Sequence, residues 1–202
     1  MKMKMKIKLF ILLLLTFFSC KVLYYKYYGV KPLKLFNEQK YTLFLSALDT
    51  SIFYFSDIVS SSKQFERIYT LSDDPKHIKM LYQPVQILYF KSEDLVSYHI
   101  NCDAEPEKRN LNWNAKNQFD VFPPHSTIEN LYLTLKLKQY QEIYPEIVSD
   151  KTYVILVFWT LAMENISENA IKTVKTNIIN HNMQDSVSVF LINIDNFYIN
   201  KF

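Results

Sequence analysis

A single glycine constrains this chain more than any other feature of its sequence. Gly29 is the only glycine among 202 residues. Phosphate-binding loops, dinucleotide-binding fingerprints and the nucleophile elbow all require glycine, because their backbones adopt positive φ or approach a ligand too closely for a Cβ atom. The sequence therefore disfavours these three classes of enzyme site. Turns must use Asn, Asp and Ser instead, as residues 101–103 and 112–117 indicate.

Composition predicts one domain. The chain is 49% hydrophobic and 16% aromatic, which is enough apolar material for one sizeable core. The first 19 residues hold four lysines and no carboxylate, so their removal changes the formal charge from +3 to −1. The remaining chain is close to neutral and carries no cluster of Lys and Arg of the kind that binds nucleic acid.

The first 20 residues have the layout of a secretory signal peptide. Residues 1–8 are basic, residues 9–18 form an apolar stretch of ten, and Ser19 precedes Cys20. Ten apolar residues are too few to span a bilayer, which takes about 20 helical residues, and Lys21 ends the stretch. We expect residues 1–19 to be a signal peptide. The alternative is a signal anchor that stays attached.

The end of this segment, Thr16-Phe17-Phe18-Ser19-Cys20, resembles the lipobox of bacterial lipoproteins, with Phe17 where leucine is usual. The resemblance implies cleavage before Cys20, a lipid on Cys20, and a membrane-anchored protein that faces the periplasm. The chain as a whole resembles small uncharacterised lipoproteins of Bacteroidetes, which also implies a cell-envelope address. We expect residues 20–36 to be the lipid anchor and tether, whose Tyr and Lys side chains at 22–35 would contact an anionic membrane. Residues 37–202 would form one α/β domain.

Patterns in the first half of this domain predict helices followed by a hairpin. We expect a helix over residues 38–48, a buried strand over 51–55 and a helix over 61–71 that begins at a run of serines. A further helical turn follows Pro75. Alternating residues then predict strands over 85–90 and 95–102, joined by a turn at 91–94.

Residues 103–124 read as a long irregular connection. The segment is rich in Asn and contains three prolines, and Trp113 and Phe119 would pin it to the core. After it, Ser126 and Glu129 have the spacing of a capping box, which predicts a helix that runs to about Tyr140.

The C-terminal third predicts a βαβ unit. Residues 153–159 form a continuous apolar run that is typical of a strand buried on both faces. Asn165 and Glu168 would cap a helix with apolar spacing up to Ile178, and residues 187–194 form a second apolar strand. The two strands should be parallel with a right-handed crossover. We expect an α/β or α+β fold with a mixed sheet and helices packed on it.

The same unit resembles part of a thioredoxin fold. The resemblance rests on two segments, Val-Ile-Leu-Val-Phe-Trp at 154–159 and Leu-Ile-Asn-Ile-Asp at 191–195. Where that family has Cys-x-x-Cys, residues 162–166 contain no thiol, so the resemblance implies a redox-dead, thioredoxin-like unit. Because the chain stops at Phe202, any further strands must come from upstream, for which the 85–102 hairpin is the candidate.

Cys102 is the candidate reactive thiol. A lone cysteine on the apolar face of a strand is more often a small buried hydrophobe. His99 stands three positions earlier, and an odd spacing in a strand places the two side chains on opposite faces. We therefore expect no shared metal ion.

Three other clusters are weaker candidates. Asp120, His125 and Ser126 are the residue types of a hydrolytic trio, but Ser126 is better explained as a helix cap. A hard cation could bind an acidic loop, for which a solvated loop is the default interpretation. Three aromatic residues form a candidate recognition loop for a peptide or glycan, with core packing as the alternative. The acidic residues are Asp103, Glu105 and Glu107, and the aromatic residues are Trp113, Phe119 and Phe122.

These observations favour a non-enzymatic envelope lipoprotein that binds another protein or stabilises an assembly. We expect no cofactor. Two alternatives stay open: a thiol-dependent envelope enzyme that uses Cys102, and a binder of apolar ligands or lipids.

Overall fold

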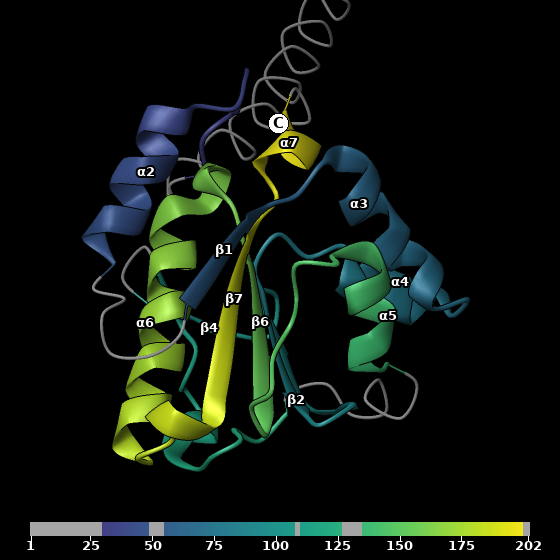
Figure 1. The fold of residues 1–202 in the computed structure, drawn as a ribbon. Helices are drawn as coiled ribbons and strands as arrows, with labels where there is room; N and C mark the ends of the chain where they lie inside the picture. Colours follow the sequence, from purple (N-terminus) through teal and green to yellow (C-terminus); the bar gives the residue numbers. More distant parts are fainter. Residues whose placement is uncertain (1–29, 49–54, 108–109, 127–134, 200–202) are drawn as a thin grey trace, which may run out of the picture.

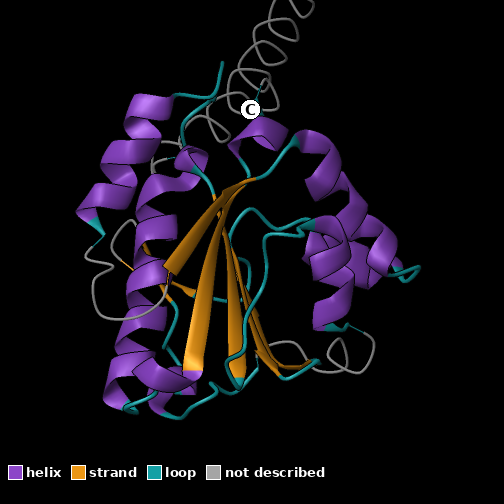
Figure 2. Ribbon diagram, in the orientation of Figure 1, coloured by secondary structure: helices purple, strands orange, loops and turns teal. Residues whose placement is uncertain are grey.

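A mixed five-stranded sheet forms the centre of the molecule (Figures 1 and 2). The computed structural model describes residues 30–48, 55–107, 110–126 and 135–199. The first three strands of the sheet are parallel, and the last two continue it in antiparallel fashion. In spatial order the strands are β1 (Phe55–Val59), β7 (Val187–Asn193), β6 (Tyr153–Trp159), β2 (Gln86–Lys91) and β3 (Asp94–Ile100). The predicted fold class, a mixed sheet with helices packed on it, is confirmed.

Helices cover both faces of this sheet (Figure 2). One face packs against α2 (Glu38–Ala47) and α6 (Glu164–Asn180), and the other packs against α3 (Ser62–Arg67), α4 (Pro75–Leu81) and α5 (Leu137–Ile143). Alternate residues of one strand serve the two cores: Phe158 faces the α3 side, whereas Val157 and Trp159 face the α6 side. This division explains why β6 is apolar at every position.

The predicted βαβ unit is present as β6, α6 and β7, with Val157 opposite Leu191 in the parallel register. The start of its helix differs from the prediction. Thr160 caps a 3₁₀ turn, η3 (Leu161–Met163), by accepting a hydrogen bond from the Ala162 nitrogen at 3.1 Å, and α6 follows directly. The predicted cap at Asn165 and Glu168 is therefore wrong, because Thr160 initiates the helical turns five residues earlier.

The hairpin of β2 and β3 is confirmed, and it completes the sheet beside β6 as expected. Its turn contains Ser92 at a φ of 54°. Asn117 and Asn182 take similar left-handed conformations elsewhere. Asn and Ser thus occupy positive-φ positions that glycine usually fills.

Three predicted helix starts in the first half have side-chain caps. Asn37 begins α2, Ser61 begins α3 in a capping box with Gln64, and Asp74 begins α4 ahead of Pro75. The 61–71 helix changes to a 3₁₀ turn, η1 (Ile68–Leu71). The strand predicted over residues 51–55 falls outside the described residues except for Phe55, where β1 begins and continues to Val59.

The helix predicted from Ser126 to Tyr140 is present over its last four residues and is wrong at residues 135 and 136. Residues 127–134 lie outside the described residues, and Lys136 is extended and forms a bridge with Asp94 at the edge of β3. The helix α5 begins only at Leu137. The hydroxyl of Ser126 accepts from the nitrogen of Tyr98 and donates to its carbonyl oxygen, both at 3.2 Å. At Ser126 and at Lys136, contacts with the edge of the sheet take the place of the predicted helical turns.

The connection over residues 103–124 contains more structure than predicted. It holds a small hairpin, β4 (Glu105–Glu107) and β5 (Asn110–Asn112), and a 3₁₀ turn, η2 (Gln118–Asp120). Trp113 and Phe119 are buried in the α6-side core, which confirms their role as aromatic pins. Within the part of the chain that the structure describes, no helix has the length and apolar content needed to cross a bilayer.

Candidate functional site

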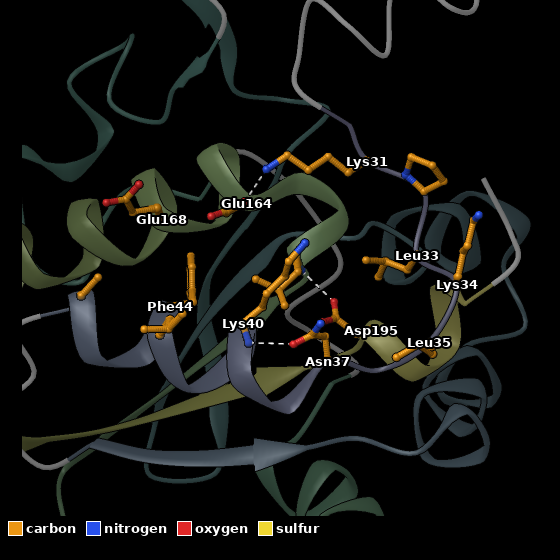
Figure 3. A pocket seen from close by; sticks show the side chains of 14 residues that line it. Lys31, Leu33, Lys34, Leu35, Asn37, Lys40, Phe44, Glu164, Glu168 and Asp195 are labelled. Atoms are coloured by element: carbon orange, nitrogen blue, oxygen red, sulfur yellow. Dashed lines mark hydrogen bonds and ion pairs between the residues drawn. The ribbon is translucent and has the colours of Figure 1, made fainter.

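A cavity of about 620 Å³ opens at the carboxyl ends of β6 and β7, and we call it the edge pocket. In open α/β sheets this end is the usual place for a ligand site. Three chain segments form its walls: residues 31–37, which we call the strap, the helix α2, and the turn that leads into α6 (Figure 3). Its lining residues include Leu33, Asn37, Phe44, Ala47, Leu161 and Asp195.

The strap is fixed to the domain by main-chain and apolar contacts. The nitrogen of Lys31 donates to the carbonyl oxygen of Ala162 at 2.8 Å. Val30 is buried, and Leu33 packs against the core. From Val30 onward the chain therefore belongs to the domain, whereas we had expected the tether to extend to residue 36.

Asp195 forms a buried polar junction at the base of the pocket. Its side chain is 1% exposed. Its Oδ1 accepts from the hydroxyl of Thr160 and from the nitrogen of Leu161, both at 2.7 Å. Burial raises the pKa of this carboxyl above its usual value, although the hydrogen bonds from Thr160 and Leu161 oppose that shift. Asp195 thus holds together two connections that begin at neighbouring strands.

Charges around the pocket are unequally compensated. Glu164 pairs with Lys31 at 2.5 Å, as Figure 3 shows, and Glu168 pairs with Lys172 at 2.7 Å. Lys34 and Lys40 also line the pocket, and their ammonium groups have no ion-pair partner among the described residues. Among the described residues, the lysines at the mouth of the pocket therefore include two positive charges without an acidic partner.

The rim of the pocket is apolar and exposed to solvent. Leu35 on the strap and Leu43 on α2 are 67% and 60% exposed. Deeper in α2, Phe44 stacks on Trp159 with ring centroids 4.4 Å apart, which anchors the helix to β6. The wall of the pocket is therefore anchored to the sheet, whereas the two rim leucines lie free of the core.

The structure corrects the interpretation of Cys102. We expected a buried strand residue, but β3 ends at Ile100 and Cys102 lies in an exposed turn. Its Sγ donates to Oε1 of Gln83 at 2.9 Å. Partial burial and the nearby Asp103 raise the pKa of the thiol, which lowers the thiolate fraction that thiol chemistry needs. Cys20, the predicted lipid-attachment residue, lies outside the described residues.

The predicted recognition loop is packed inward. Trp113 and Phe119 are buried, and Phe122 is partly buried against the same core. Phe122 makes edge contacts with Tyr89 and Tyr153 at centroid distances of 5.7 and 5.0 Å. These three side chains hold the 103–124 connection on the sheet. The alternative given from the sequence, that they pack in the core, is therefore the one that the structure supports.

The three residues of the candidate hydrolytic trio make separate contacts in the fold. Asp120 accepts from the side-chain amide of Asn114 at 2.9 Å, His125 is exposed, and Ser126 is bonded to β3.

The two candidate cation sites gain no support. His99 is buried on the α6 side of β3, whereas Cys102 is exposed, and the ring of His99 is tilted against that of Phe119 with centroids 4.6 Å apart. Glu105 and Glu107 are exposed in β4. Within the described ranges, no group of three or more His, Cys, Asp or Glu side chains could hold a metal ion.

Sequence patterns missed most of the pocket. Asp195 did appear in the Asn-x-Asp ending of the last strand, and a charged residue directly after a buried strand was a usable signal. Lys40 and Leu43 lay on an ordinary predicted helix, and Lys34 and Leu35 lay in the predicted tether. Nothing local to these residues indicates that strap and helix meet.

Comparisons with known protein families, curated proteins and solved structures return no match. The likeness of residues 153–195 to a thioredoxin unit and the lipoprotein character of the N-terminus accordingly stay predictions from the sequence.

Proposed function

We propose that this chain is a membrane-tethered lipoprotein of the cell envelope whose α/β domain is a binding module, with the edge pocket as its binding site. The single observation that supports binding is the composition of that pocket. It joins exposed leucines at the rim, Leu35 and Leu43, to two uncompensated ammonium groups, those of Lys34 and Lys40. A site of this kind suits a ligand with both apolar and anionic parts.

The tethering half of the proposal rests on the first 20 residues. Basic residues, a short apolar stretch and a lipobox-like ending precede Cys20. It is tested by feeding cells a labelled fatty acid and comparing the wild type with a Cys20→Ala variant. Label that enters only the wild type, together with release of the variant from the membrane fraction, is the expected result. Equal absence of label, with both proteins still in the membrane, would contradict lipidation and favour an uncleaved anchor.

The binding half is tested by placing a photo-crosslinking residue at position 43. Val148 offers a matched control, because it is 73% exposed and precedes the amino end of β6, whereas the pocket lies at the carboxyl end. We expect a discrete adduct from position 43 and none from position 148 in intact cells. Equal, diffuse labelling at both positions would refute a dedicated site. The sequence-based hypothesis favours another envelope protein as the ligand, with apolar ligands or lipids as an alternative.

A further inference from the structure

We propose that the edge pocket docks onto an anionic phospholipid surface, with Leu35 and Leu43 entering the interface while Lys34 and Lys40 bind lipid phosphates. This inference deepens the proposed function and rests on it in one respect, because the lipid tether would hold the domain next to a membrane. The remaining support comes from the pocket itself.

Charge complementarity gives the first reason. Both acidic side chains at the exposed wall are already paired, Glu164 with Lys31 and Glu168 with Lys172. The third carboxyl, that of Asp195, is buried and accepts two hydrogen bonds within the fold. Lys34 and Lys40 therefore present positive charge that the described wall does not compensate, and phosphate groups are suitable counter-charges.

The exposed leucines give the second reason. Leu35 and Leu43 are the two most exposed leucines in the part of the chain that the structure describes, and both line the edge pocket. Exposed apolar residues flanked by lysines are typical of surfaces that rest in the headgroup region, because the apolar side chains reach the acyl boundary while the ammonium groups stay among the headgroups.

The position of the strap gives the third reason. Nine residues separate Cys20 from Val30, where the described chain begins. Nine residues reach at most about 30 Å when fully extended. The strap follows directly, at the end of the molecule where α2 begins and α7 (Asp195–Tyr198) lies (Figure 1). A lipid on Cys20 therefore keeps Val30, where the strap begins, within about 35 Å of the membrane. A protein ligand would have to fit between the strap and the bilayer.

The test measures whether position 43 contacts lipid. Full-length Leu43→Trp protein is reconstituted into vesicles of phosphatidylcholine alone, or of phosphatidylcholine with about one-third phosphatidylglycerol, using lipids brominated on the acyl chains. The native tryptophans, Trp113 and Trp159, are buried and serve as background. We expect quenching of the tryptophan introduced at position 43 in the anionic vesicles and much less in the neutral ones. Val148→Trp is the positional control and should not be quenched.

Charge variants test the role of the lysines. Adding Lys34→Gln and Lys40→Gln should lower the ratio of docked to undocked protein by about 30-fold, because each basic residue near an anionic surface contributes about 1 kcal/mol. Lys138→Gln with Lys151→Gln is the matched pair, because both residues are exposed and lie outside the pocket. This pair should leave the quenching unchanged. Thermal unfolding of every variant verifies that it is folded.

Several outcomes would overturn the docking proposal. Equal quenching in neutral and anionic vesicles would exclude selectivity for an anionic surface. Quenching that is unchanged by the Lys34 and Lys40 substitutions would exclude binding through these two ammonium groups. Absent quenching, with a protein adduct at position 43, would assign the pocket to a protein segment. Mass spectrometry of Cys20 on the same sample separates the two proposals: an acylated chain without quenching at position 43 refutes docking alone, and quenching without acylation refutes the lipoprotein assignment alone.

Discussion

Oδ1 of Asp195 lies 2.7 Å from the backbone nitrogen of Leu161, and this hydrogen bond joins the connection after β7 to the connection after β6. The hydroxyl of Thr160 donates to the same oxygen. Two parallel strands separated by 27 residues of chain thus end in one junction, and the floor of the edge pocket rests on it.

Asp195→Ala should lower the free energy of unfolding by about 3 kcal/mol, because it leaves two buried donors without an acceptor. Asp195→Asn retains an acceptor oxygen and should cost about 1 kcal/mol or less. Urea denaturation of the two variants gives both values. Equal losses would show that the charge of Asp195, and not its acceptor oxygen, holds the junction.

His99 should make stability depend on pH. Burial lowers its pKa from 6.5 to about 3, and its Nε2 lies 3.0 Å from the hydroxyl of Ser97. In the unfolded chain His99 binds a proton below about pH 6.5, whereas in the folded chain it binds one only below about pH 3. The contribution of the neutral His99 to stability is therefore fully present above that range and is lost as the pH falls. The free energy of unfolding should decrease by about 2 kcal/mol between about pH 7.5 and about pH 5.

The control for this effect is His99→Gln, which should remove that part of the pH slope. The raised pKa of Asp195 contributes with the opposite sign, because a carboxyl that is easier to protonate when folded loses stability as the pH rises. The difference between wild type and variant isolates the histidine. Parallel pH profiles for the two proteins would contradict the assignment.

Asn177 should control the attachment of the 103–124 connection. Its buried Nδ2 donates to the carbonyl oxygens of Phe119 and Val121 at 2.7 and 2.8 Å, and its Oδ1 accepts from Tyr89 at 3.2 Å. Asn177→Leu leaves the loop carbonyls without this donor and should cost about 2–3 kcal/mol. We also expect faster amide exchange over residues 113–124. Tyr89→Phe removes only the third bond and should cost about 1 kcal/mol; similar exchange in both variants would argue against a specific role for the amide.

Cys102 should react with maleimide in the folded protein, but more slowly than an unhindered peptide thiol at neutral pH. It is exposed, yet its raised pKa reduces the thiolate fraction. Asp103→Asn removes one cause of the raised pKa and should speed the reaction severalfold, whereas Asp150→Asn, which changes a carboxyl that does not contribute to that shift, should not. A wild-type rate above that of the peptide would revive the thiol-enzyme alternative.

Local patterns were sufficient for most of the fold. The continuous apolar run of β6, the alternation of the hairpin and the caps at Asn37, Ser61 and Asp74 each reflect interactions within a few residues, so the sequence expresses them directly. They were insufficient where a distant strand competes with a local preference. Lys136 pairs with Asp94 instead of continuing a helix, because an unpaired strand edge offers main-chain partners that no local pattern records.

The sequence by itself determined four of the five strands of the sheet (β2, β3, β6 and β7), the parallel βαβ unit and the use of Asn and Ser in turns that lack glycine, because periodicity and backbone sterics act along the chain. Only the tertiary structure decided that the strap crosses the start of α6, that Lys34 and Lys40 meet Leu35 and Leu43 around one pocket, and that Asp195 is buried beneath them. The physical reason is that burial and charge compensation depend on which segments become neighbours in space. A residue's own sequence environment does not contain that information.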